Sequence, residues 1–120
     1  MAVKWMLAQM TVAELEESVA WYARLFGRQP DDRPMGGLAE WYLDETIGVQ
    51  VWAEPDRAGR STMVLEESDL DALAAHLGSV GIEHVGPWEA SKTRIVQVSD
   101  PDGNHVVFTG TADATGLART

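Results

Sequence analysis

The sequence contains no cysteine and no long apolar run. Without cysteine the chain can form no disulfide, no thiolate metal site and no cysteine nucleophile. A membrane helix needs about 18 or more consecutive apolar residues, and no segment of this chain provides them. The start, Met1-Ala2-Val3-Lys4, also lacks the pattern of a signal peptide. These absences predict a cytoplasmic protein that does not enter a membrane.

Basic residues are scarce as well, with 9 lysines and arginines against 19 aspartates and glutamates and a formal net charge of −10. Such a surface repels a phosphate backbone, so nucleic acid is not an expected partner. The excess of carboxylates is typical of a solvated acidic surface, and it would also favour a cationic ligand; the charge alone does not decide between these two interpretations. The length of 120 residues fits one globular domain.

Two segments of the chain resemble each other and have helical periodicity. They are TVAELEESVAWYARLFG (Thr11 to Gly27) and EESDLDALAAHLGSVG (Glu66 to Gly81). Apolar residues recur along one helical face in each, for example Val19 and Tyr22 in the first and Leu70 and Leu77 in the second. The pattern predicts two helices, one in each half of the chain.

The ends of both predicted helices are marked by capping residues. Thr11 and Glu14 have the spacing of a capping box at the start of the first helix, and Gly27 is a natural stop at its end. Ser68 is the expected N-cap of the second helix, with Asp71 at the third helical position.

Strand-like runs flank both helices. They are VKWMLAQM, LAEWYLD and IGVQVWAE in the first half and STMVLE, IEHVG, TRIVQVS and NHVVFTG in the second. Asp100-Pro101-Asp102-Gly103 is a tight turn between the last two runs. Each half is therefore predicted to be a β-α-β-β unit with room for one more short strand, in an α+β fold. The predicted modules span residues 1–56 and 57–112, and 113–120 form a flexible tail.

Two motifs resemble those of the vicinal oxygen chelate superfamily. SVAWYARLFG lies late in the first helix, and DPDGNHVVF opens the last strand. This superfamily includes glyoxalase I, extradiol dioxygenases, fosfomycin-resistance enzymes and bleomycin-resistance proteins, and the resemblance covers Val3 to Gly110. It implies two βαβββ modules that curve into a half-barrel sheet around a cavity, with the helices outside. It also implies a homodimer.

Metal-using members of this superfamily carry His, Glu or Gln ligands on the inward faces of four strands. The resemblance transfers those four positions to Leu7, Gln50, Thr62 and Val107. Two of them are aliphatic and have no lone pair, and a neutral threonine hydroxyl is a poor ligand for these metals. We therefore predict no metal, no other cofactor and no catalytic residue. A slip in strand register would instead bring Gln9 or Glu66 to a ligand position.

Alternation along the strands extends the lining of the predicted cavity. The expected ligand-binding residues are Trp5, Leu7, Gln9, Trp41, Gln50, Trp52, Thr62, Val64, Trp88 and Val107. The chain has five tryptophans, of which Trp21 is expected to pack in the core from the first helix. The other four would give aromatic walls for a flat ligand, although core or interface packing explains any one of them equally well. Glu40, Glu54 and Glu89 are expected near the mouth, where carboxylates would suit a cation.

The leading hypothesis is a protein that binds a small aromatic or cationic molecule without chemistry, similar to the drug-sequestering bleomycin-resistance proteins. The alternative is a metal-dependent lyase or dioxygenase similar to glyoxalase I, with ligands in a shifted register. A metal-free enzyme with a Glu, His or Tyr base, such as Tyr42, is the third hypothesis. The sequence contains no Ser/His/Asp arrangement, glycine-rich phosphate loop or nucleotide motif.

The metal content of the purified protein separates the first two hypotheses. We expect untagged protein, after exposure to iron, manganese, nickel and zinc, to contain no stoichiometric metal by elemental analysis, because three of the four expected positions offer no good ligand. Stoichiometric metal would mean that the register is wrong, and the ligands would then lie among Gln9, Gln50, Glu66 and the histidines.

Overall fold

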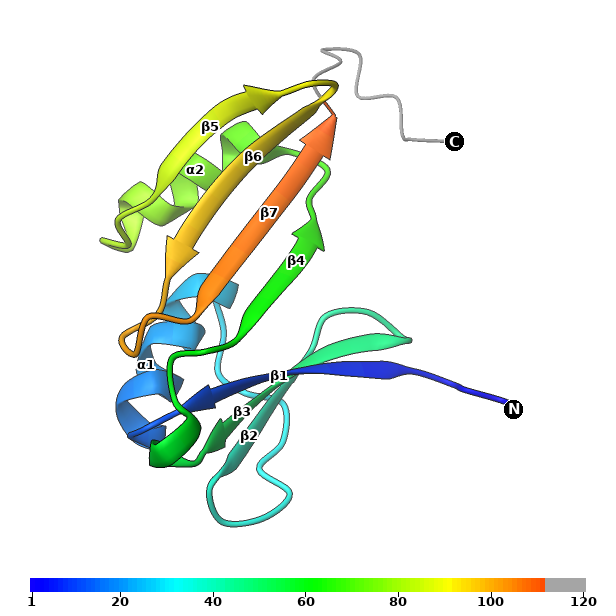
Figure 1. The fold of residues 1–120 in the computed structure, drawn as a ribbon, viewed down its shortest axis with the longest axis vertical. Helices are drawn as coiled ribbons and strands as arrows, with labels where there is room; N and C mark the ends of the chain where they lie inside the picture. Colours follow the sequence, from blue (N-terminus) through cyan, green and yellow to red (C-terminus); the bar gives the residue numbers. More distant parts are fainter. Residues whose placement is uncertain (112–120) are drawn as a thin grey trace. The chain divides into compact units, whose positions relative to one another are not determined.

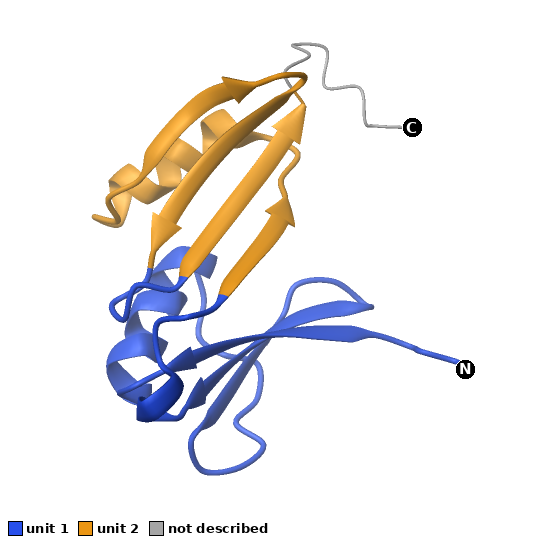
Figure 2. Cartoon of the chain, viewed as in Figure 1, with its two compact units in different colours: residues 1–61, 100–104 blue, residues 62–99, 105–120 orange. Residues whose placement is uncertain are grey.

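The computed structural model describes residues 1–111, which form two compact units (Figures 1 and 2). Unit 1 contains residues 1–61 and 100–104, and unit 2 contains residues 62–99 and the chain from His105 onward. The first division between the units lies after Ser61. The modules at residues 1–56 and 57–112 stay a prediction. The predicted tail at 113–120 lies outside the described residues.

Unit 1 combines one long helix with a three-stranded sheet (Figure 1). Its elements are β1 (Met6–Val12), α1 (Leu15–Phe26), β2 (Leu38–Tyr42), β3 (Ile47–Ala53) and the 3-10 helix η1 (Pro55–Arg57). The strand order is β1-β3-β2, with β3 parallel to β1 and antiparallel to β2. An isolated bridge joins Asp32 to Glu40, and no further strand lies among the described residues between α1 and β2.

The core of unit 1 lies between α1 and one face of this sheet. The sheet residues on that face are fully buried: Met10, Val12, Ala39, Trp41, Val49 and Val51. Val19, Tyr22 and Leu25 of α1 are also buried, because the apolar positions recur on one side of the helix.

The ends of α1 match the prediction at one end only. Gly27 ends the helix in the left-handed conformation at φ 74°, as expected, and its N–H donates to the Ala23 carbonyl. The capping-box prediction was wrong: Glu14 is the N-cap residue without a side-chain cap, and Thr11 belongs to β1.

Unit 2 repeats the pattern with a four-stranded sheet, and α2 packs on one face of it (Figure 1). Its elements are β4 (Thr62–Glu66), α2 (Leu70–Ser79), β5 (Val85–Ala90), β6 (Thr93–Ser99) and β7 (His105–Thr111). The order is β4-β7-β6-β5, and only the pair β4–β7 is parallel. The N-cap of α2 is Asp69, which accepts a hydrogen bond from Ala72 N at 2.9 Å, and not Ser68 as predicted.

The predicted α+β class, with one helix and one sheet in each unit, is confirmed. Within residues 1–111, neither helix has the length and apolar character needed to cross a membrane.

The turn at residues 100–104 connects β6 to β7 and is part of unit 1. The carboxylate of Asp100, in a residue only 5% exposed, accepts four hydrogen bonds. The Tyr22 hydroxyl donates to it at 2.8 Å and the Asn104 side-chain amide at 2.7 Å. The backbone N–H groups of Asp102 and Asn104 each donate at 2.9 Å. A buried carboxylate is stable only when its oxygens are satisfied in this way.

Further hydrogen bonds tie the same turn to the end of β1. The Asn104 side-chain amide donates to the Thr11 carbonyl at 2.8 Å, and its oxygen accepts from Ser61 N at 2.8 Å. Asp102 accepts from Ala13 N at 3.2 Å. A Cβ on Gly59 would lie 2.4 Å from the Asp102 carbonyl oxygen, so only glycine fits this approach. The Asp-Pro-Asp-Gly-Asn motif therefore has a structural role in unit 1.

This network predicts a specific loss of stability at alkaline pH. Burial, and then the negative charge of Asp100, raises the pKa of Tyr22 above its ordinary value of 10.0. The folded state holds the phenolic proton more tightly, so the stabilisation is complete below pH 10.0 and is lost as the pH rises above it. We expect the free energy of unfolding of the wild type to fall by about 1.4 kcal/mol more than that of Tyr22→Phe between neutral pH and about pH 11.

Urea denaturation across this pH range measures the effect. Glu17→Gln, which changes an exposed side chain of α1 and leaves both tyrosines in place, is the control and should show the same fall as the wild type. Identical pH profiles for wild type and Tyr22→Phe would contradict the prediction.

Candidate functional site

The face of the unit 1 sheet that points away from α1 carries polar side chains. We call it the polar face, and its residues are Leu7, Gln9, Glu40, Tyr42, Gln50 and Trp52. Strand alternation places them together, because neighbouring residues on a strand point to opposite faces. Gln50 lies between Gln9 on one neighbouring strand and Glu40 on the other.

A chain of hydrogen bonds crosses all three strands of this face. Gln9 Nε2 donates to Gln50 Oε1 at 3.0 Å, and Gln50 Nε2 donates to Glu40 Oε2 at 2.6 Å. The Tyr42 hydroxyl donates to Glu40 Oε1 at 2.8 Å. Glu40 is only 6% exposed. Both of its carboxylate oxygens accept hydrogen bonds from side chains of the same face, which compensates for their burial.

Gly48 makes room for the apolar part of the polar face. It is paired with Leu7 on β1 and with Tyr42 on β2. A Cβ at this position would lie 2.7 Å from Leu7 Cδ2 and 2.8 Å from the Trp41 carbonyl oxygen. Because glycine has no side chain, Leu7 and Tyr42 can close over β3 from both sides.

Tyr42 is a hydrogen-bond donor in this arrangement and not a base. The hydrogen bond to Glu40 is the largest of the effects that raise the pKa of Tyr42 to about 12. A phenol with this pKa stays protonated at neutral pH. The structure therefore gives no support to Tyr42 as the general base of a metal-free enzyme.

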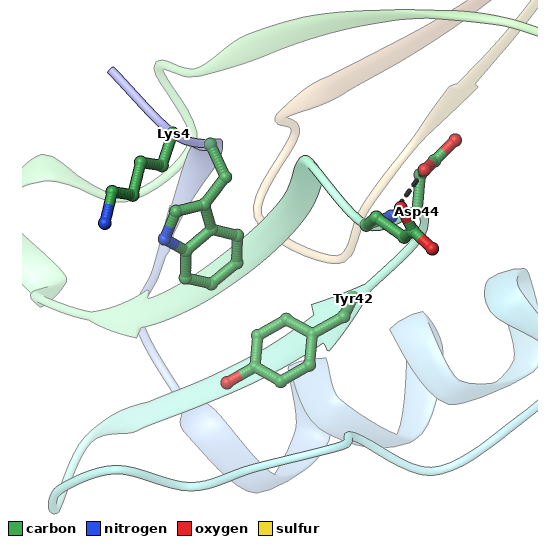
Figure 3. Close-up of a pocket in the computed structure, with 5 residues that line it drawn as sticks. Lys4, Tyr42 and Asp44 are labelled. Carbon is green, nitrogen blue, oxygen red and sulfur yellow. Dashed lines mark hydrogen bonds between the residues drawn. The ribbon is translucent and has the colours of Figure 1, made fainter. Parts of the chain in front are cut away.

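A hollow of about 420 Å³ adjoins Tyr42 (Figure 3). It is lined by Lys4, Trp5, Tyr42, Asp44 and Glu45. The rings of Trp5 and Tyr42 meet edge to face, with centroids 5.4 Å apart at an angle of 69°. Lys4 and Asp44 lie on different sides of Tyr42 in Figure 3. The hollow therefore has charged groups of both signs next to its two aromatic rings. The volume falls in the range that accommodates small organic molecules.

Trp52 is half-buried at the other end of the polar face. Its indole N–H donates to Glu54 Oε1 at 3.1 Å, and Glu54 pairs with Arg57 at 3.5 Å. A Cβ on Gly37 would lie 3.4 Å from the indole ring, so the loop before β2 packs closely on Trp52. These contacts hold the ring in place, with part of it accessible.

Unit 2 has a corresponding face on its own sheet, which mixes apolar side chains with polar ones such as Gln97 and Thr109. Val64 on β4 is paired with Val107 on β7, and Gln97 on β6 is paired with Val107 from the other side. Thr62 lies two residues before Val64 and therefore points to the same face. Trp88 joins this face through Ile95 and is 39% exposed, while Val64 is 63% exposed.

Most of the predicted ligand-binding residues are brought together within their own unit. In unit 1 these are Leu7, Gln9, Gln50 and Trp52 on the polar face, with Trp5 at the adjoining hollow. In unit 2 they are Thr62, Val64, Trp88 and Val107. Strand parity was therefore assigned correctly for β1, β3, β4 and β7.

Trp41 is the exception and corrects one prediction. It is fully buried on the α1 side of the sheet, where its ring centroid lies 5.6 Å from that of Phe26 and 6.1 Å from that of Tyr22. Its indole N–H donates to the Arg28 carbonyl at 2.9 Å. Trp41 is thus a core residue and not a ligand-binding residue.

The same one-residue error in β2 hid two residues of the polar face. Placing Trp41 in the cavity assigns its neighbours Glu40 and Tyr42 to the opposite face of β2, and Glu40 was predicted only near the mouth. Had the larger indole been assigned to the core, alternation alone would have placed both residues correctly. Lys4, Asp44 and Glu45 lie outside the strands, where no periodicity could indicate them.

The residues at the four positions suggested by the resemblance do not fit a divalent metal. Leu7 and Val107 have no donor atom, and Thr62 offers only a neutral hydroxyl. The amide oxygen of Gln50, the remaining donor, already accepts the Gln9 N–H at 3.0 Å. Among residues 1–111, no three His, Cys, Asp or Glu side chains gather closely enough to hold an ion.

Comparison with known proteins gives a family and a set of similar structures. The sequence profile of the glyoxalase-like domain matches residues 7–109. A glyoxalase/bleomycin resistance protein from Catenulispora acidiphila is 28% identical, with a TM-score of 0.82 over 88% of this chain and 96% of that one. TnmS3, an antibiotic binding protein from Streptomyces sp. CB03234, is 22% identical, with a TM-score of 0.74 over 93% and 97% of the two chains.

A bleomycin-binding protein, solved in complex with bleomycin, is 19% identical, with a TM-score of 0.74 over 87% of this chain and 95% of that one. The comparison with curated protein sequences produced no match.

The different roles of two tryptophans can be tested by stability. We expect Trp41→Ala to lower the free energy of unfolding by about 3–5 kcal/mol, because it empties a fully buried site. Trp52→Ala should cost less than half as much, because the ring is partly exposed. Urea denaturation of both variants measures the difference. If Trp41→Ala does not fold, the smaller change Trp41→Phe replaces it in this measurement. Equal losses at both positions would contradict the assignment of Trp41 to the core.

Proposed function

Because this chain belongs to the glyoxalase-like domain family, we propose that it binds a small aromatic or cationic molecule, without a metal and without chemistry, as a resistance protein that sequesters a drug. One observation carries the proposal: the buried Glu40 carboxylate lies beside accessible aromatic rings on one face of unit 1. The proposed binding surface is the polar face together with the hollow beside Tyr42.

The charge of this surface supports a cationic ligand. Glu40 is shielded from water, so a cation that reached it would interact more strongly than with an exposed carboxylate. The adjoining hollow adds two carboxylates, Asp44 and Glu45, against the single amine of Lys4. The formal net charge of −10 would also steer a cation toward the chain.

The aromatic residues support a flat ligand. Trp5 and Tyr42 form one edge-to-face pair at the hollow, and Trp52 is held by Glu54 at the other end of the polar face. Rings in fixed orientations provide stacking surface for an aromatic ligand, and they attract a cation through their faces.

Binding is favoured over catalysis by the chemistry of the same residues. Tyr42 remains protonated at neutral pH, and the positions that hold metal in related enzymes do not fit a divalent ion. Structures with this fold include proteins described as antibiotic binding and bleomycin-binding, which supports the proposal at the level of the fold. The proposal retains the homodimer that the resemblance implies and the cytoplasmic location predicted from the absence of a membrane helix and a signal peptide.

Isothermal titration calorimetry in the presence of a chelator tests the proposal. We expect metal-free bleomycin or the planar cation proflavine to bind with a Kd of about 1 μM or below. Trp52→Ala should weaken binding about tenfold, because it removes one aromatic surface. Glu17→Gln, which removes one exposed charge from α1, is the control and should bind like the wild type.

Two results would overturn this function. One is the absence of binding for both compounds and for a wider panel of aromatic cations. The other is turnover of a substrate that depends on added metal.

A further inference from the structure

We infer that Glu40 fixes the direction of the hydrogen-bond chain Gln9–Gln50–Glu40–Tyr42, and that the polar face therefore selects ligands that donate N–H groups. This inference rests on the proposed function, because it specifies the ligand chemistry of the same face. It assigns Glu40 as a positioning residue that acts through Gln50 and Gln9.

The direction of the chain starts at Glu40. A carboxylate only accepts hydrogen bonds, whereas a glutamine amide has one end that donates and one that accepts. Gln50 lies 2.6 Å from Glu40, so its Nε2 has to face the carboxylate. The hydroxyl of Tyr42, protonated at neutral pH, donates to the other oxygen at 2.8 Å.

The orientation of Gln50 then determines that of Gln9. With Nε2 turned toward Glu40, Gln50 presents its Oε1 to Gln9 and accepts the Gln9 N–H at 3.0 Å. The oxygen of the Gln9 amide is left without a partner among residues 1–111, on a side chain that is exposed. The chain thus ends in the Gln9 oxygen, an acceptor at the accessible edge of the polar face, beside the second N–H of the same amide, which the chain does not use.

No residue of the polar face carries a positive charge. A ligand that offers N–H groups would satisfy the Gln9 oxygen and gain from the charge of Glu40. A ligand of the same shape with acceptor atoms would place its lone pairs against the Gln9 oxygen and near the charge of Glu40, and it could pair only with the second Gln9 N–H. Specificity is the difference between two affinities, so weak binding of the acceptor ligand contributes to it as much as strong binding of the donor ligand.

Glu40→Gln removes this constraint with little change of shape. A glutamine at this position can donate as well as accept, so the amides of Gln50 and Gln9 can turn in either direction. Gln50→Met separates direction from charge, because it keeps Glu40 and the side-chain length but breaks the link to Gln9. Glu17→Gln again controls for the loss of one negative charge.

Three compounds of nearly equal shape provide the probes. Benzamidine is cationic and only donates hydrogen bonds, benzamide is neutral and both donates and accepts, and benzoate is anionic and only accepts. The side-chain amide signals of Gln9 and Gln50 in 15N-labelled protein report binding at this face by NMR. In the wild type and in Glu17→Gln we expect benzamidine to shift both signals and to bind at least about tenfold more tightly than benzoate. The preference should fall severalfold in Glu40→Gln and in Gln50→Met, with the backbone spectrum showing that each variant is folded.

Each other result overturns the inference. Equal affinities for benzamidine and benzoate in the wild type would exclude selection for donors, and so would the absence of shifts at Gln9 and Gln50 with every probe. A preference that survives in Gln50→Met would mean that charge alone selects the ligand. If bleomycin or proflavine still binds in these cases, the proposed function stands without this inference; if neither binds, both fail.

Discussion

The Asp100 carboxylate accepts four hydrogen bonds inside unit 1. These bonds hold the turn at residues 100–104 against α1. Tyr22 on α1 donates to this carboxylate, and Asn104 in the same turn reaches Thr11, which is 93 positions earlier in the chain. A turn that lies between two strands of unit 2 is thereby built into unit 1. A buried carboxylate is costly when its hydrogen-bond partners are missing, so the burial of Asp100 requires that Tyr22 and Asn104 are both in place.

The polar face depends on the core on the other side of the same sheet. Trp41 is buried against α1, so Glu40 and Tyr42, its neighbours in β2, have to point the other way. The register of β3 then brings Gln50 next to Glu40, and β1 adds Gln9. Packing of one large aromatic residue thus decides which carboxylate orders the amides of the polar face.

Membership of the glyoxalase-like domain family defines the scaffold, and the chemistry depends on a few side chains placed on it. At the positions that the resemblance assigns to metal ligands, this chain has Leu7 and Val107, which offer no donor atom, and Thr62, whose neutral hydroxyl is a poor ligand. The one amide among them, Gln50, is linked instead to a carboxylate. The same scaffold that can support metal chemistry is here proposed to present an aromatic and acidic surface for binding.

The sequence by itself determined the α+β class, both helices, the hairpin at Asp100–Gly103 and the faces of Leu7, Gln9 and Gln50, because periodicity and turn residues are local properties. The tertiary structure decided what local patterns leave open. It placed Trp41 in the core and Glu40 on the polar face, since an aromatic residue on a strand can point to either side until the helix that covers it is known. It also revealed the partners of Asp100 and the direction of the amide chain, since both depend on contacts between residues distant in sequence.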